Sequence, residues 1–126
     1  AQDIFCARQF ELLPKRLPSM VSVGMFHTLL LRSDGSVVGA GKNSGWKEGA
    51  NQLDIPELPK GERYVQSTCG MHHSMVVRTD GVAAACGNDA SRQCDIPAPA
   101  DGVVFTQAAA GQYFSALLDT HGDVCL

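Results

Sequence analysis

A pattern that occurs three times constrains this chain more than any single motif does. Residues 21–41, VSVGMFHTLLLRSDGSVVGAG, place Gly24 three residues before a histidine, followed by an apolar run and an Asp-Gly turn. The same order begins again at Gly70 and at Gly111, so the period is 46 residues and then 41. The five extra residues of the first period all lie after Gly41. A regular period of this length indicates a repeat architecture.

The positions that the copies share form a repeat signature. It consists of the opening glycine, a histidine, the Asp-Gly turn and a closing glycine: Gly24, His27, Asp34, Gly35, Gly41, Gly70, His73, Asp80, Gly81, Gly87, Gly111 and Gly122. The third copy departs from this signature, because Phe114 stands at the histidine position and His121 stands where the other copies have aspartate.

The repeated segments predict short β-strands. They are expected at residues 21–23, 26–32, 37–40, 64–68, 72–78, 82–86, 103–110 and 113–119, with another at the end of the chain. The Asp-Gly pairs predict two-residue type I′ hairpin turns, in which both residues have positive φ. Helical repeats are disfavoured because glycine and proline recur in every period. We therefore expect an all-β chain, a partial β-propeller of about two and a half antiparallel blades.

The chain divides into an N-terminal extension, residues 1–20, and propeller-type repeats at 21–65, 66–106 and 107–126, the last incomplete. Within the extension, Asp3–Leu13 predicts either a short amphipathic helix or an irregular leader. The chain starts without methionine and ends inside a repeat, so we expect a processed or partial segment. An open arc of blades exposes sheet edges, which more of the same chain or partner proteins would cover.

The order G-x-x-H-[TS], apolar triplet, Asp-Gly turn and closing glycine resembles the regulator-of-chromosome-condensation-type repeat over residues 21–126. The short period resembles the bacterial-style version found in the propeller-type β-lactamase inhibitor protein. Residues 93–97, QCDIP, are similar to dinoflagellate proteins with many such repeats. One departure is that Ala40 and Cys86 replace the usual tryptophan before the closing glycine.

That resemblance implies a propeller that usually closes with seven blades and binds other proteins. Family members include nucleotide-exchange factors for a small GTPase, parts of ubiquitin ligases and an inhibitor of β-lactamases. Their contact loops have no match in this chain, so no residue role is transferred from them.

Charge and hydropathy narrow the classes of partner. The formal net charge is −3 and the pI is about 5.7, which argues against nucleic acid as a partner. Apolar runs are far shorter than the ~20 residues of a membrane-spanning helix, although peripheral association with a membrane complex stays open. Five cysteines cannot all pair within the chain. Cys69, Cys86 and Cys94 occupy small apolar slots of the repeat, which favours a reducing compartment, with an organelle still open.

Metal and nucleophile motifs are weak. The segment Cys69–His73 offers a zinc half-site, but adjacent strand residues point to opposite faces, so His72 and His73 do not share an ion. His27 and His73 are instead expected to be structural, bonded to backbone inside a blade. Asp34 and Asp80 are expected to form turns and not a catalytic carboxylate pair.

A phosphate loop is also excluded in detail. The sequence around Gly41 and Lys42 has Ser36 where the motif needs glycine and Asn43 where it needs serine or threonine. The sequence therefore predicts no cofactor, no metal and no enzymatic activity.

The expected role is a non-catalytic protein–protein interaction or scaffolding module, an accessory subunit or segment of a larger assembly. Trp46, Lys47 and Glu48, in the loop made longer by the extra residues, are the candidate partner contact, and the alternative is that Trp46 packs on its own blade. Other hypotheses are an exchange-factor-like regulator of a small GTPase or of chromatin, and an accessory subunit of an organelle, photosynthetic membrane complex. An enzyme is the least favoured.

Overall fold

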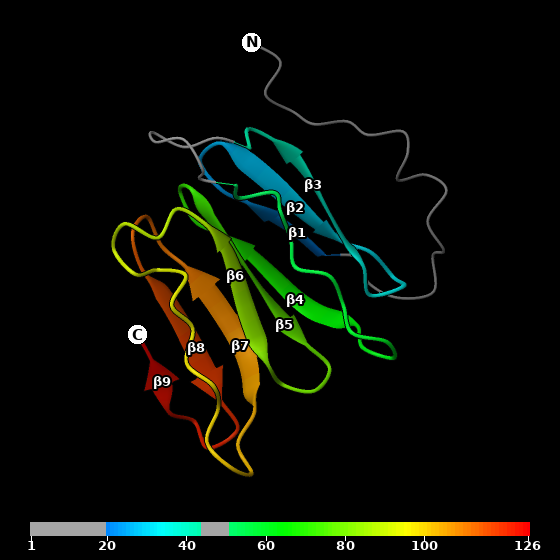
Figure 1. Cartoon of the computed structure of the whole chain (residues 1–126), viewed down its shortest axis with the longest axis vertical. Helices are drawn as coiled ribbons and strands as arrows, with labels where there is room; N and C mark the ends of the chain where they lie inside the picture. Colours follow the sequence, from blue (N-terminus) through cyan, green and yellow to red (C-terminus); the bar gives the residue numbers. More distant parts are fainter. Residues whose placement is uncertain (1–19, 44–50) are drawn as a thin grey trace.

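The computed structural model describes residues 20–43 and 51–126, and within them it is entirely β (Figure 1). The predictions for residues 1–19, including the helix at Asp3–Leu13, and for Trp46, Lys47 and Glu48 lie outside the described residues. The strands are β1 (Met20–Val23), β2 (His27–Leu31), β3 (Val37–Gly41), β4 (Tyr64–Cys69), β5 (His73–Arg78), β6 (Ala83–Gly87), β7 (Phe105–Ala110), β8 (Ser115–Asp119) and β9 (Val124–Cys125).

The strands form three antiparallel sheets, one for each copy of the repeat. Their orders are β1-β2-β3, β4-β5-β6 and β7-β8-β9, and we call them blades 1, 2 and 3. Figure 1 shows the blades following one another, with β1, β4 and β7 in contact in series. The third blade is incomplete because β9 pairs only through Val124 and Cys125. The prediction of a partial propeller of about two and a half blades is confirmed.

The described residues contain no helix, and so none long and apolar enough to cross a membrane. The strands begin and end within two residues of the predicted positions. The repeat divisions at 65/66 and 106/107 fall inside β4 and β7, so they mark the sequence period and not the gaps between blades.

The hairpin turns differ from the prediction. Glycine has positive φ in each turn, as at Gly35 (83°) and Gly81 (80°), whereas among the described non-glycine residues only Arg92 does. The N–H of Gly35 donates to the Arg32 carbonyl at 3.0 Å, and the Arg32 N–H donates to the carbonyl of Ser36 at 2.8 Å. These bonds define a three-residue loop, a type I turn followed by a left-handed glycine. The type I′ prediction is therefore wrong, because the aspartate keeps negative φ.

The aspartate has another role in these turns. The side chain of Asp34 accepts the N–H of Ser36 at 2.9 Å, and that of Asp80 accepts the N–H of Val82 at 3.1 Å. Bonds to Ser36 lower the pKa of Asp34, and the bond from Arg78 lowers the pKa of Asp80. Each aspartate therefore stabilises its turn by accepting the N–H of the residue two positions later, which is the role of a turn former.

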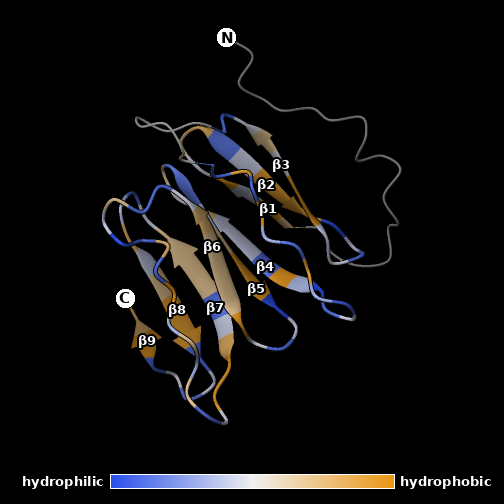
Figure 2. Ribbon diagram, in the orientation of Figure 1, coloured by the Kyte–Doolittle hydropathy of each residue, from blue (hydrophilic) through white to orange (hydrophobic). Residues whose placement is uncertain are grey.

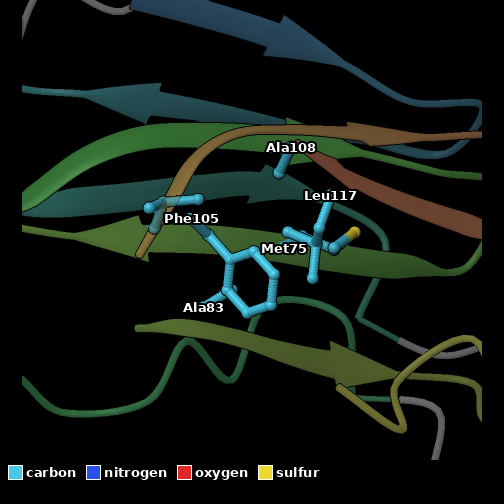
Figure 3. Close-up of a cluster of buried hydrophobic side chains, with 6 residues drawn as sticks. Met75, Ala83, Phe105, Ala108 and Leu117 are labelled. Carbon is cyan, nitrogen blue, oxygen red and sulfur yellow. The ribbon is translucent and has the colours of Figure 1, made fainter. Parts of the chain in front are cut away.

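Apolar side chains fill the space between neighbouring blades. Figure 2 shows the hydrophobic residues concentrated on the strands and the hydrophilic residues on the loops. Between blades 2 and 3, Met75 meets Phe105, Leu117 and Ala108 (Figure 3). Between blades 1 and 2 the buried residues are Leu31, Tyr64 and Val76. Because each core is shared by two blades, a blade is stabilised by its neighbours.

The turn glycines of blades 1 and 2, Gly35 and Gly81, also pack against the segment that leads into the next blade. The carbonyl of Gly35 accepts the N–H of Tyr64 at 2.8 Å, and the carbonyl of Gly81 accepts the N–H of Phe105 at 2.9 Å. A Cβ atom on Gly81 would lie 2.1 Å from the Cβ of Val104. The turn of one blade therefore fixes where the next blade begins.

Candidate functional site

The signature histidines link neighbouring blades. His27, at the start of β2, is 3% exposed, and its Nε2 lies 2.8 Å from the Oγ of Ser74 in blade 2. The Ser74 hydroxyl donates to the carbonyl of Gln52 at 2.6 Å, in the segment between the two blades. The expected backbone partner inside the same blade is therefore wrong, since the histidine reaches the next blade.

Blades 2 and 3 are joined in the same way. Nε2 of His73 lies 3.1 Å from the Oγ of Ser115, and the hydroxyl of Ser115 donates to the carbonyl of Gln93 at 2.7 Å. His73 is completely buried. We call each set of histidine, serine hydroxyl and glutamine carbonyl a joint. Its repetition shows that the joint belongs to the architecture and is not an isolated contact.

The joint also defines which nitrogen of the ring carries hydrogen. The single hydroxyl proton of Ser74 points to the Gln52 carbonyl, so the hydroxyl oxygen can only accept from His27. His27 therefore carries hydrogen on Nε2, and because burial lowers its pKa to about 4, the ring is neutral near pH 7. Its Nδ1 is buried without a hydrogen-bond partner among the described residues, so a second proton there would be buried without compensation.

Acidification is expected to destabilise the fold between pH 6.5 and about 4. Burial lowers the pKa of His27 from 6.5 to about 4, and burial also lowers that of His73. The unfolded chain binds these protons more tightly than the folded chain does. The contribution of the neutral histidines to the free energy of unfolding is therefore fully present above pH 6.5 and is lost as the pH falls toward 4. With solvent screening allowed for, the free energy of unfolding should fall by about 1–2 kcal/mol at pH 5.

Urea unfolding at pH 7.5 and pH 5 measures this loss. His27→Gln should make the loss smaller, whereas substitution of the exposed His121 should leave it unchanged. The same loss in His27→Gln as in the native chain would assign the acid sensitivity to other groups.

The turns between the first two strands of each blade form one continuous surface. The Phe26 ring stacks on the ring of His72, with centroids 4.8 Å apart and planes 14° apart. The side chain of Gln112 donates to the sulfur of Met71 at 3.3 Å. These contacts connect the turns of blades 1, 2 and 3 in sequence. We call the solvent-facing side chains of these turns the turn-end surface: Met25, Phe26, Met71, Gln112 and Tyr113.

This surface is apolar and accessible. Met25 is 61% exposed, Phe26 37% and Tyr113 53%. The ammonium of Lys42 lies 5.5 Å from the Phe26 ring centroid, at the start of the loop that contains the predicted contact residues. Asn43 closes the base of that loop, accepting from the Leu53 N–H at 2.7 Å and donating to Asp54 at 3.1 Å. The part of the loop that holds Trp46 stays outside the described residues.

The sequence-predicted signature residues lie at turns, at joints or at the ends of strands. The opening glycines occupy the turn-end side, the Asp-Gly pairs occupy the opposite turns, and the closing glycines end β3 and β6. Sequence reasoning missed the other halves of the joints: Ser74, Ser115, Gln52 and Gln93. A signal was present, since each glutamine stands two residues before the Asp-Ile-Pro segment.

The described cysteines are free thiols, and three of them, Cys69, Cys86 and Cys94, have little reactivity. Burial raises the pKa of Cys86 to about 12 and that of Cys94 to about 11, and it also raises that of Cys69. A thiol reacts as its thiolate, so these groups are inert near neutral pH. Across residues 20–43 and 51–126, no three His, Cys, Asp or Glu side chains converge as metal ligands would.

Comparisons with known proteins agree with this architecture. No family model matches the chain. The chain is 28% identical over 115 residues to the protein RCC2 homolog of Xenopus laevis, a match that covers 78% of this chain and 22% of that protein. The chain thus spans about a fifth of the length of this curated relative.

Solved structures share the fold. Prp20p of Saccharomyces cerevisiae, whose structure was described with its binding properties to Gsp1p and histones, superposes with a TM-score of 0.68 at 22% identity, over 89% of this chain and 31% of that one. Human WBSCR16 superposes with a TM-score of 0.67 at 23% identity, and the match covers 89% of this chain and 35% of that one. The ectodomain of the Physcomitrella patens receptor kinase CR4 superposes with a TM-score of 0.60 at 22% identity, and the match covers 82% of this chain and 27% of that one.

Together these matches support propeller repeats of the regulator-of-chromosome-condensation type. The similarity to dinoflagellate repeat proteins stays a prediction.

Proposed function

We propose that this chain is a non-catalytic protein-binding module that contacts its partner through the turn-end surface. The observation that carries the proposal is the exposure of Met25, Phe26 and Tyr113 on turns that the joints hold in fixed positions. Methionine and aromatic residues are enriched in protein interfaces. Loops on a rigid scaffold are also where binding residues concentrate.

The relatives support a protein as the partner. Prp20p binds Gsp1p and histones, so a propeller of this type presents protein-binding surfaces. A regulator of a small GTPase or of chromatin, and an accessory subunit of an organelle or photosynthetic membrane complex, are narrower hypotheses within the same class. The net charge of −3 supports a protein partner over nucleic acid.

Photo-crosslinking tests this surface directly. A benzophenone amino acid placed at position 25 or 113 should give discrete protein adducts in an extract of the source organism. The same group at exposed Lys60, in the connector before β4, is the matched control and should give none of these adducts. Excess untagged native chain should remove the adducts.

A charged variant completes the test. Met25→Glu combined with Tyr113→Glu should compete about tenfold less well than the native chain, because interface anchors of this kind contribute 1–2 kcal/mol or more. If this variant competes as well as the native chain, or if position 60 yields the same adducts, the partner binds elsewhere.

A further inference from the structure

The chain contains three Asp-Gly pairs, which begin at Asp34, Asp80 and Asp101. In such a pair the glycine nitrogen can attack the aspartate side chain, because glycine has no side chain of its own to shield the nitrogen. The product is a five-membered succinimide ring, which water reopens to aspartate or to isoaspartate. The three pairs differ in how strongly the fold holds the two reacting groups.

The Asp80 pair is held at both groups. The N–H of Gly81 donates to the Arg78 carbonyl at 3.0 Å. The Asp80 carboxylate accepts the N–H of Val82 at 3.1 Å and two N–H groups of the Arg78 side chain, at 3.1 and 2.7 Å. The bond from Arg78 lowers the pKa of Asp80, which depletes the protonated carboxyl that would react. Equivalent bonds hold the Asp34 pair.

The pair formed by Asp101 and Gly102 has none of these restraints. It lies in a type II turn of the connector before β7, where the Val103 N–H donates to the Ala100 carbonyl at 3.0 Å and the φ of Gly102 is 76°. Within the described part of the chain, no hydrogen bond or ion pair holds the Asp101 carboxylate, and the Gly102 N–H donates to no carbonyl. Both residues are exposed, and a Cβ on Gly102 would meet nothing within 4 Å.

We propose that Asp101 is a site of spontaneous isoaspartate formation in the folded chain, and that the hairpin turns protect Asp34 and Asp80 from the same change. The nitrogen of Gly102 attacks Cγ of the protonated Asp101 carboxyl, a C–N bond forms, and the carboxyl hydroxyl leaves as water with the amide proton. Water then opens the ring, and opening at the main-chain carbonyl of Asp101 leaves the backbone running through Cβ. Water is the only other reactant.

The modified connector is longer by one backbone atom. Just beyond the site, Val104 packs on Gly81 and the N–H of Phe105 donates to the Gly81 carbonyl at 2.9 Å. The site therefore lies where the connector positions blade 3 against blade 2. This end of the blades is opposite to the turn-end surface, so the inference does not rest on the proposed function.

Incubation of the folded native chain for several weeks at pH 7.5 tests the site. Trypsin then places the three pairs in separate peptides, which are residues 33–42, 79–92 and 93–126. Electron-transfer fragmentation in the mass spectrometer locates isoaspartate within each peptide. Isoaspartate should form about tenfold or more faster at Asp101 than at Asp80, because the turn at Asp80 must first open and lose its hydrogen bonds.

The unfolded chain is the matched control, because residues 80–82 and 101–103 are both Asp-Gly-Val. In guanidinium chloride the two sites should react at similar rates. Asp101→Lys is the control variant, since it copies Lys60 and Gly61, the pair in the equivalent turn of the first connector. It should remove most of the isoaspartate that forms in the folded chain, as measured by enzymatic methylation of the isoaspartyl carboxylate.

Each of three results would overturn the proposal. Equal rates at Asp80 and Asp101 in the folded chain would mean that the turn bonds give no protection. A difference that persists in guanidinium chloride would assign the selectivity to sequence and not to the fold. An undiminished signal in folded Asp101→Lys would place the modification elsewhere. None of these results bears on crosslinking from position 25, so failure of this proposal and failure of the protein-binding surface are distinguishable.

Discussion

Gly81→Ala is expected to lower the free energy of unfolding by about 3 kcal/mol or more, whereas Gly122→Ala should cost only about 1 kcal/mol. The two glycines occupy the left-handed position of equivalent turns in blades 2 and 3, with φ of 80° for Gly81 and 86° for Gly122. An alanine pays the same backbone strain at either site, so strain alone predicts equal effects.

The difference comes from what surrounds the added methyl group. At Gly81 it would lie 2.1 Å from the Cβ of Val104, an atom fixed to the backbone, while at Gly122 nothing lies within 4 Å. The connector would have to move, and with it the hydrogen bond from the Phe105 N–H to the Gly81 carbonyl and the buried Phe105 ring. The substitution therefore damages the boundary between blades 2 and 3.

Urea unfolding of the two variants measures the comparison. Val104→Gly removes the obstructing atom, so it should recover part of the loss when combined with Gly81→Ala, beyond the sum of the single effects. Equal losses in Gly81→Ala and Gly122→Ala would mean that the connector does not constrain the turn.

Ser74→Ala is expected to cost about 2–3 kcal/mol, a large effect for the loss of one oxygen atom. Ser74 is 1% exposed, and its hydroxyl accepts from Nε2 of His27 while it donates to the Gln52 carbonyl. Without the hydroxyl, the buried N–H of His27 has no acceptor and the carbonyl keeps only a weak contact with the Cys86 thiol at 3.5 Å. A buried polar group left without its partner costs about 1–3 kcal/mol.

Thr28→Ala provides the control at the equivalent position of blade 1. Thr28 takes part in no joint among the described residues, so the change should cost about 1 kcal/mol or less, mainly through the lower strand preference of alanine. The measurement is the change in urea midpoint for both variants at pH 7.5. If Thr28→Ala and Ser74→Ala cost the same, the joint does not contribute to stability.

Much of the fold follows from the periodicity of the sequence. The spacing of Gly24, Gly70 and Gly111 predicts three units. The short apolar runs, each ended by a turn, predict strands, because both features depend only on residues that are close in the sequence. The turn type was not predictable in this way. An Asp-Gly pair suits a type I′ turn as well as a type I turn with a left-handed glycine, and the length of the loop decides between them.

The joints were harder to infer than the strands. The histidine and the serine that it meets belong to different copies, 47 residues apart for His27 and Ser74. Aligning copies shows which positions are equivalent, but it does not show which residue of one copy touches which residue of the next. That pairing depends on how the blades stack. The exposure of Met25 and Tyr113 also depends on stacking, because equivalent positions in blade 2 are more buried.

The joints run from each histidine to the blade that follows it, and this direction has a consequence for how the chain folds during synthesis. A ribosome releases blade 1 before Ser74 exists outside the exit tunnel, so the imidazole of His27 stays without its acceptor until most of blade 2 has emerged. Blade 2 depends in the same way on Ser115. Each of the first two units is then completed by its successor and not by itself. Phe114 ends this dependence, because a phenyl ring in that position needs no later hydroxyl.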